Sequence, residues 1–279
     1  MAYERKDAVA DISPELRQQE NHDMAESSWA ERWLSTERLV PYLEASDGDL
    51  GTALDLYRWN AELGQVLMRD ISFFEVALRN AYDNVMQECW QGDDHWLLDD
   101  KSPARKQVVR KRGKGDANEV NRKIIDRAAK GLTPGYSAGQ LVSSLTLGFW
   151  VHLTDRSREA VIWRTCLHRA WPKGTNRAEL QDHLDGILRV RNRVAHGERL
   201  FDPRREQLSP MRVDADVVRL LGLLCPQAAE YLYPNDAAPI EEFLEKNPAP
   251  ANVSLLGPQD AEADGATSSN PQGAENTKE

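Results

Sequence analysis

The feature that most constrains this fold is a run of apolar residues from Leu50 to Trp90, which recur at steps of three and four. That spacing places them on one face of an α-helix. The run is far longer than any ordinary strand, so it predicts one long helix, with Gly64 as a point where it could bend. Asp49 directly precedes the run and can cap its first turn.

The rest of the chain also favours helices, because it holds no convincing strand alternation and no repeat of solenoid length. Asp116 can cap a helix, and Ser137 with Gln140 has capping-box spacing. We expect helices at 117–130, 137–153, 157–171, 176–196, 214–224, 227–233 and 239–246. The predicted class is all-α, a single multi-helix bundle of about seven to nine helices over residues 29–246.

Both ends of the chain differ from this middle part. Residues 1–28 are polar, and residues 247–279 are rich in Pro, Ala, Asn, Gly and Ser without periodicity, so we expect two disordered tails, the second of them acidic. The tails hold seven acids against three bases and five against one, which accounts for most of the net charge of −10. Between them, bases cluster over 101–127 and 189–205. An acidic total is therefore compatible with a nucleic-acid partner, because the local field decides binding.

The sequence favours a cytoplasmic protein without a membrane segment. No apolar run approaches the roughly 20 residues that a spanning helix needs, and the first residues lack the apolar core of a signal peptide. Cys89, Cys166 and Cys225 are odd in number and far apart, so we expect reduced, buried thiols. No Cys/His spacing resembles a metal site, and we expect no cofactor.

The helix expected over 176–196 ends in a stretch whose side chains suit phosphate chemistry. Arg189, Asn192 and His196 are spaced i, i+3 and i+7, so they lie along one line, and Gly197 suits the left-handed residue that ends a helix. Arg191 lies five residues before His196, about 140° away around an ideal helix. Either the last turn is distorted, or two copies of the helix build the site together.

These residue types suit cleavage of RNA by its own 2′-hydroxyl. His196 would activate that hydroxyl or protonate the 5′-oxygen that leaves, and Arg191 would stabilise the charge on the phosphorane. Asn192 would hold a phosphate oxygen or orient the histidine. The products would be a 2′,3′-cyclic phosphate and a 5′-hydroxyl, without a metal. The alternative for His196 is a histidine that interacts only with carbonyls at the helix end.

The segment Arg191-Asn192-Arg193-Val194-Ala195-His196 resembles the R-N-x-x-x-H signature of the HEPN superfamily of all-α nucleases. Three further segments, in this order, extend the likeness to the Abi-like (abortive infection) branch of bacterial phage-defence proteins, over about residues 35–225: Leu56–Asn60, Phe74–Asn80 and Leu147–Trp150. The resemblance implies a HEPN-type fold and a metal-independent endoribonuclease, acting in phage defence or as a toxin. It also implies a homodimer whose motif helices face each other.

The same resemblance implies that Arg191, Asn192 and His196 are catalytic, and it suggests support from the segment that holds Glu75, Arg79 and Asn80. One departure is the Gly197-Glu198 pair after the histidine, where many relatives have a small polar residue or another histidine. An acid there could raise the pKa of His196 or weaken RNA binding.

Several roles stay open at this point. The pair Glu75 and Arg79 is either structural or a second layer of the site. Arg189 and Arg193 are either solvated or steer RNA, rather than being catalytic. The basic segment, with Arg110, Lys111 and Arg112, is either a solvated loop or an RNA contact. Expected partners are RNA, such as tRNA or mRNA, and an antitoxin or inhibitor protein. The alternative function is a non-catalytic helical regulator that binds RNA or protein, as an antitoxin does.

Overall fold

A computed structural model of the chain describes residues 29–109, 115–116, 118–234 and 239–257, and within them every regular element is a helix. The all-α class is confirmed. The expected long helix is α3, Leu50–Cys89, which spans 40 residues without a break. The Asp49 side chain accepts a hydrogen bond from the Thr52 amide at 2.7 Å, so it caps this helix as predicted.

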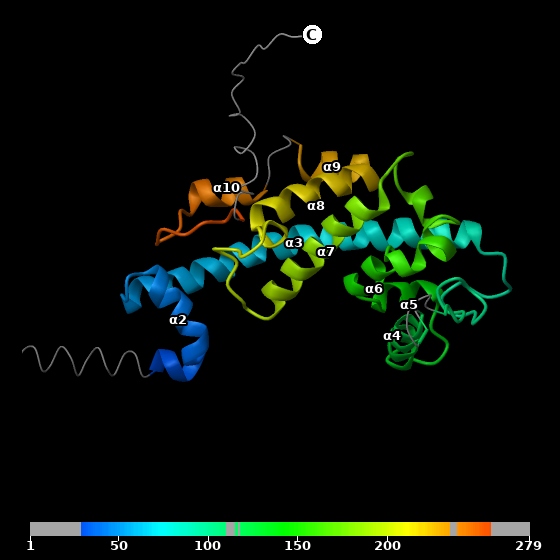
Figure 1. Cartoon of the computed structure of the whole chain (residues 1–279), viewed down its shortest axis with the longest axis horizontal. Coiled ribbons are helices and arrows are strands. Elements are labelled where there is room, and N and C mark those ends of the chain that lie inside the picture. The colour runs from blue at the N-terminus through cyan, green and yellow to red at the C-terminus, as the bar shows by residue number, and fades with distance from the viewer. Residues whose placement is uncertain (1–28, 110–114, 117, 235–238, 258–279) are drawn as a thin grey trace, which may run out of the picture.

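Helix α3 is the axis around which the other helices pack (Figure 1). α2 (Thr36–Ala45) lies at its N-terminal end, and α8 (Pro210–Leu224), α9 (Pro226–Leu232) and α10 (Pro239–Lys246) lie along one side. α7 (Arg177–Ala195) packs against both α3 and α8. The stripe of α3 that faces these helices is buried along its whole length, at Ala53, Leu56, Leu63, Leu67, Ile71, Phe74, Leu78, Tyr82 and Met86. The periodic run thus became the core, as its pattern predicted.

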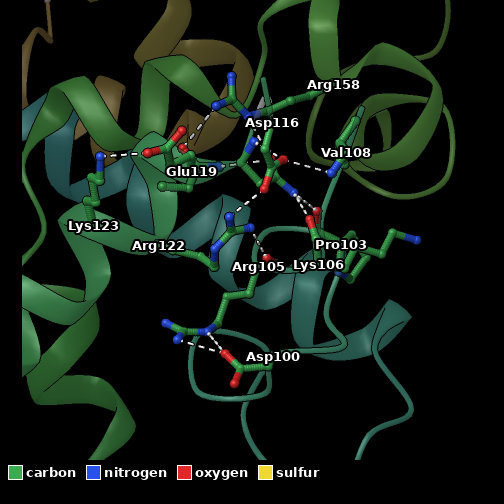
Figure 2. A network of polar contacts seen from close by, with 12 residues as sticks. Asp100, Pro103, Arg105, Lys106, Val108, Asp116, Glu119, Arg122, Lys123 and Arg158 are labelled. Atoms are coloured by element: carbon green, nitrogen blue, oxygen red, sulfur yellow. Dashed lines mark hydrogen bonds and ion pairs between the residues drawn. The ribbon is translucent and has the colours of Figure 1, made fainter. Parts of the chain in front are cut away.

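At the other end of α3, a network of polar contacts organises the chain around α4, Glu119–Lys130 (Figure 2). Asp116 accepts hydrogen bonds from the amides of Val108 and Asn118 and pairs with Arg122. The buried Arg158 guanidinium donates to the Asn118 side chain, which ties the segment at 156–158 to the start of α4. α4 begins with Asn118 at its N-cap, so the cap expected at Asp116 lies two residues too early.

The region 137–172 differs from the two continuous helices that we expected. It forms α5 (Ala138–Ser144), α6 (Leu147–His152), a 3₁₀ turn η1 (Arg156–Arg158), a π-helical turn η2 (Glu159–Trp163) and a 3₁₀ turn η3 (Leu167–Ala170). The capping box of Ser137 and Gln140 is present as predicted. α6 is buried on several sides at once, at Leu147, Phe149, Trp150 and Val151. Residues buried all round carry no single helical face, so the pattern could not show the break.

The expectation of three reduced cysteines is wrong for two of them. Cys89, at the end of α3, and Cys166, between η2 and η3, form a disulfide, and Cys225 is a free thiol. The two partners are 77 residues apart in sequence but meet because η3 packs against α3. Sequence separation says nothing of this proximity, which follows from the tertiary fold.

The expected start of the C-terminal tail is also wrong in part. Residues 247–257 pack back onto the bundle, with the Asn247 carbonyl accepting from the Trp59 indole at 2.8 Å. Further along, the Ser254 amide donates to Asp202, and the Ser209 hydroxyl donates to the Leu255 carbonyl. These contacts fix a segment that has no periodicity of its own. Residues 1–28 and 258–279, which hold the rest of the expected tails, lie outside the described residues.

In the part of the chain that the structure describes, no helix has both the length and the apolar character needed to cross a membrane.

Candidate active site

The candidate site lies at the C-terminal end of α7. Asn176 caps the helix by accepting hydrogen bonds from the amides of Ala178 and Glu179. The residues buried on its inner face are Leu180, Leu184, Gly186, Ile187 and Val190. Asn192 and His196 are exposed on the other face, as the spacing predicted, and Gly197 has the expected left-handed φ of +60°. The helix therefore presents its polar line to solvent.

Three contacts fix the turn that carries His196. Gly64 of α3 lies against Val194, where an added Cβ would be only 3.1 Å from a valine methyl carbon, so glycine permits this close approach. The buried Asn60 side chain accepts from the Leu200 amide at 2.7 Å and donates to the Glu198 carbonyl at 3.1 Å. From α2, Arg38 donates to the His196 carbonyl at 3.1 Å.

Arg38 and Asn60 thus hold the site in place, and the sequence reasoning missed both of them. The sequence does hold a signal for Asn60, because it is one of two polar residues, with Asp70, on the mostly apolar buried stripe of α3. The sequence holds no signal for Arg38, because its contact with His196 joins residues that are 158 positions apart.

The last turn of α7 is regular, so it does not bring Arg191 and His196 together. The His196 amide still donates to the Asn192 carbonyl at 3.0 Å, one helical turn earlier. Among the described residues, the Arg191 side chain has one hydrogen bond, to the Asn192 side chain at 3.5 Å, and no bond joins it to the imidazole. Of the two explanations given for the 140° offset, a distorted turn is therefore wrong for a single chain.

Arg191 faces Glu75 of α3. Burial raises the pKa of the half-buried Glu75 carboxyl, while the Arg191 charge, the Leu147 amide and the more weakly acting Arg79 oppose that rise. Within the described residues no ion pair joins Glu75 to Arg191, and none joins it to Arg79 despite their favourable i, i+4 spacing. The charge of Arg191 therefore acts on Glu75 more strongly than the charge of Arg79 does. Asn80, also on α3, is exposed to solvent.

The arginines expected to bind RNA have different surroundings. Arg189 is exposed near Asp185, while Arg193 is half-buried, donates to the Arg199 carbonyl and lies 3.5 Å from the Glu198 carboxylate. The three basic residues Arg110, Lys111 and Arg112 lie outside the described residues.

Nearby members of the basic segment are engaged with acids. Arg105 pairs with Asp100, and Arg122 pairs with Asp116 (Figure 2). Arg105 also pairs with Asp126. For Arg105 and Arg122 the structure therefore favours a structural role over an RNA contact. Across the described ranges, no group of three His, Cys, Asp or Glu side chains is placed to hold a metal ion.

A scan against models of protein families matches residues 42–202 to the family described as Abi-like protein. The match includes α3, α6 and the whole of α7, and therefore Glu75, Arg191, Asn192 and His196, whereas Arg38 lies outside it. Searches of curated proteins and of solved structures each found no match.

Proposed function

Because the chain belongs to the Abi-like protein family, whose name points to abortive infection, we propose that it is a metal-independent endoribonuclease of phage defence. The observation that carries this proposal is the end of α7. There an exposed imidazole, His196, lies on the same short stretch as the guanidinium of Arg191, whose charge acts on the half-buried Glu75 carboxyl of α3. This combination provides a proton acceptor and a phosphate ligand at the surface.

In the proposed reaction, the His196 imidazole takes the proton of a ribose 2′-hydroxyl, and the oxygen attacks the adjacent phosphorus. Arg191 stabilises the negative charge that grows on the phosphoryl oxygens, and Asn192 binds one of these oxygens. The 5′-oxygen leaves with a proton from an imidazolium. The products are a 2′,3′-cyclic phosphate and a 5′-hydroxyl end.

The proposed site is shared by two chains. Since one α7 aims Arg191 and His196 in different directions, a second copy facing the first would supply the missing group to each site. A homodimer of this kind needs no change in the regular last turn. An inhibitor or antitoxin that separated the chains would silence the enzyme.

The test is cleavage of total RNA by the purified full chain in the presence of EDTA. We expect the wild type to cut, and Arg191→Ala and His196→Ala to lose at least about 100-fold in rate, the usual contribution of an acid–base group. His152→Ala is the matched control, because it removes a histidine at the end of α6. If His152→Ala lost as much activity as His196→Ala, or if EDTA abolished cleavage, the proposal would be wrong.

A second function, a non-catalytic regulator that binds RNA or protein, is favoured by one observation. Within a single chain, the two groups of the motif share no contact. RNA binding without cleavage, undiminished in His196→Ala, would support this alternative.

A further inference from the structure

A cleft of about 560 Å³ opens between α2 and the connector that follows α7, beside the turn that carries His196. Four arginines line it: Arg38, Arg193, Arg199 and Arg204. The connector and α2 lie at the same end of the molecule in Figure 1. Arg38 joins this cleft to the candidate active site directly, since it donates to the His196 carbonyl at 3.1 Å.

Each of the three carboxylates that line the cleft has a partner within the chain. Glu198 pairs with Arg193, and Asp202 accepts a hydrogen bond from the Ser254 amide. Glu37, in the first turn of α2, interacts with its own backbone amide and with Ser35, which lower the pKa of its carboxyl. Four arginines and three carboxylates thus line the cleft, and the one ion pair among these side chains within the described residues is Glu198 with Arg193.

Arg199 and Arg204 have no carboxylate partner within 4.0 Å among the described residues. The Arg199 guanidinium lies over the Phe201 ring, 5.6 Å from its centroid, so its position is fixed while its charge remains available. Arg204 is exposed at the rim. Two guanidiniums thus face the cleft without an acid, which is an arrangement that binds phosphate.

A second, independent observation points to a ligand. Tyr42 lines the cleft with only 1% of its surface exposed, and its hydroxyl has no hydrogen-bond partner among the described residues. Arg38, Arg193 and Arg199 line the same cleft as Tyr42. A buried donor left unsatisfied is costly, and a phosphate oxygen would accept from such donors.

We infer that this arginine cleft binds a backbone phosphate of the RNA strand next to the phosphate that is cut. The inference rests on the proposed function for the identity of the strand. The cleft is an anchoring subsite: it holds the strand in register with His196 and takes no part in bond breaking.

The test measures binding of a fluorescent single-stranded RNA to the full chain that carries His196→Ala, so that the substrate stays intact. Into this background we introduce Arg199→Ala with Arg204→Ala, and as a matched control Arg205→Ala, an exposed arginine next to Arg204 that does not line the cleft. We expect the double variant to weaken binding at least tenfold and the control less than twofold. The salt dependence should also fall by about 0.7 in log–log slope for each phosphate that the double variant no longer binds.

Three further results separate the possible outcomes. Equal binding by the double variant and the control would overturn the inference. If the wild type cut no RNA but RNA binding still depended on the cleft, the proposed nuclease activity would be wrong and the inference about the cleft would stand. Finally, ATP and inorganic phosphate serve as competitors: if ATP alone bound the cleft, and RNA did not, the ligand would be a free nucleotide and the assignment to a strand would be wrong.

Discussion

At the scale of single residues, we expect the charge of the Glu75 carboxylate to help position Arg191. Replacing Glu75 by Gln keeps its shape and its acceptor for the Leu147 amide but removes the charge that faces the guanidinium. We expect a loss of about tenfold in the rate of RNA cleavage, equivalent to about 1.4 kcal/mol, with little change in melting temperature. Glu62→Gln, an exposed position on the same helix, is the control. Equal rates for the two variants would show that Glu75 does not position Arg191.

Asp214 of α8 makes stability depend on pH. It is fully buried, one of its oxygens has no hydrogen-bond partner among the described residues, and burial with the nearby charges of Asp70 and Glu241 raises its pKa from 3.8 to about 7. Because the folded state holds this proton more tightly than the unfolded state, the free energy of unfolding falls as the pH rises from about 4 to about 7.

Asp214→Asn removes that titration. We expect the variant to gain roughly 1–3 kcal/mol of stability over the wild type between pH 5 and pH 8, measured by denaturant unfolding at each pH. The Asn oxygen can still accept from the Ile240 amide. Asp55→Asn, at an exposed position, should show no such pH-dependent gain. A constant difference between Asp214→Asn and wild type across this range would contradict the account.

At the scale of elements, Asn60 of α3 anchors the connector after α7. Asn60→Ala removes the acceptor of the Leu200 amide and the donor to the Glu198 carbonyl, so we expect a loss of about 1–3 kcal/mol in stability. Hydrogen exchange gives the sharper measurement: the Leu200 amide should lose its protection. Gln65→Ala, exposed on the same helix, should leave that amide protected. Protection of Leu200 retained in Asn60→Ala would show that other contacts hold the connector.

The elements also show what the sequence could predict. α3 and α7 each bury one stripe, so the sequence predicted their apolar period, their caps and the left-handed Gly197. The motif of Arg191, Asn192 and His196 could also be predicted, because its residues lie close together in sequence, in the last turns of one helix and its cap. The broken segment at 145–172 was not, because its residues are buried on several sides.

Contacts between parts of the chain that are distant in sequence could not be predicted either. Three of these contacts depend on how the helices pack. They are the disulfide of Cys89 and Cys166, the packing of residues 247–257 onto the bundle, and the hydrogen bond from Arg38 to the His196 carbonyl. The pattern of neighbouring residues does not show which distant segments pack together. The sequence therefore predicted the motif of the site but not the residues that hold it in place.

At the scale of the whole molecule, the proposed site requires two chains. If each site takes its guanidinium from one chain and its imidazole from the other, mixing Arg191→Ala with His196→Ala restores one intact site in each mixed dimer. Random mixing should then recover about a quarter of the wild-type cleavage. Light scattering of the same samples should show dimers. Dimers that form and exchange chains yet recover no activity would place both groups of each site in one chain.

The chemistry of the RNA ends tests the central claim most directly. RNA from cells that express the full chain should carry new 2′,3′-cyclic phosphate and 5′-hydroxyl ends at defined positions, and these ends should be absent from cells that express His196→Ala. New ends that bear 3′-hydroxyl and 5′-phosphate groups, or ends that persist in His196→Ala, would contradict cleavage by Arg191 and His196.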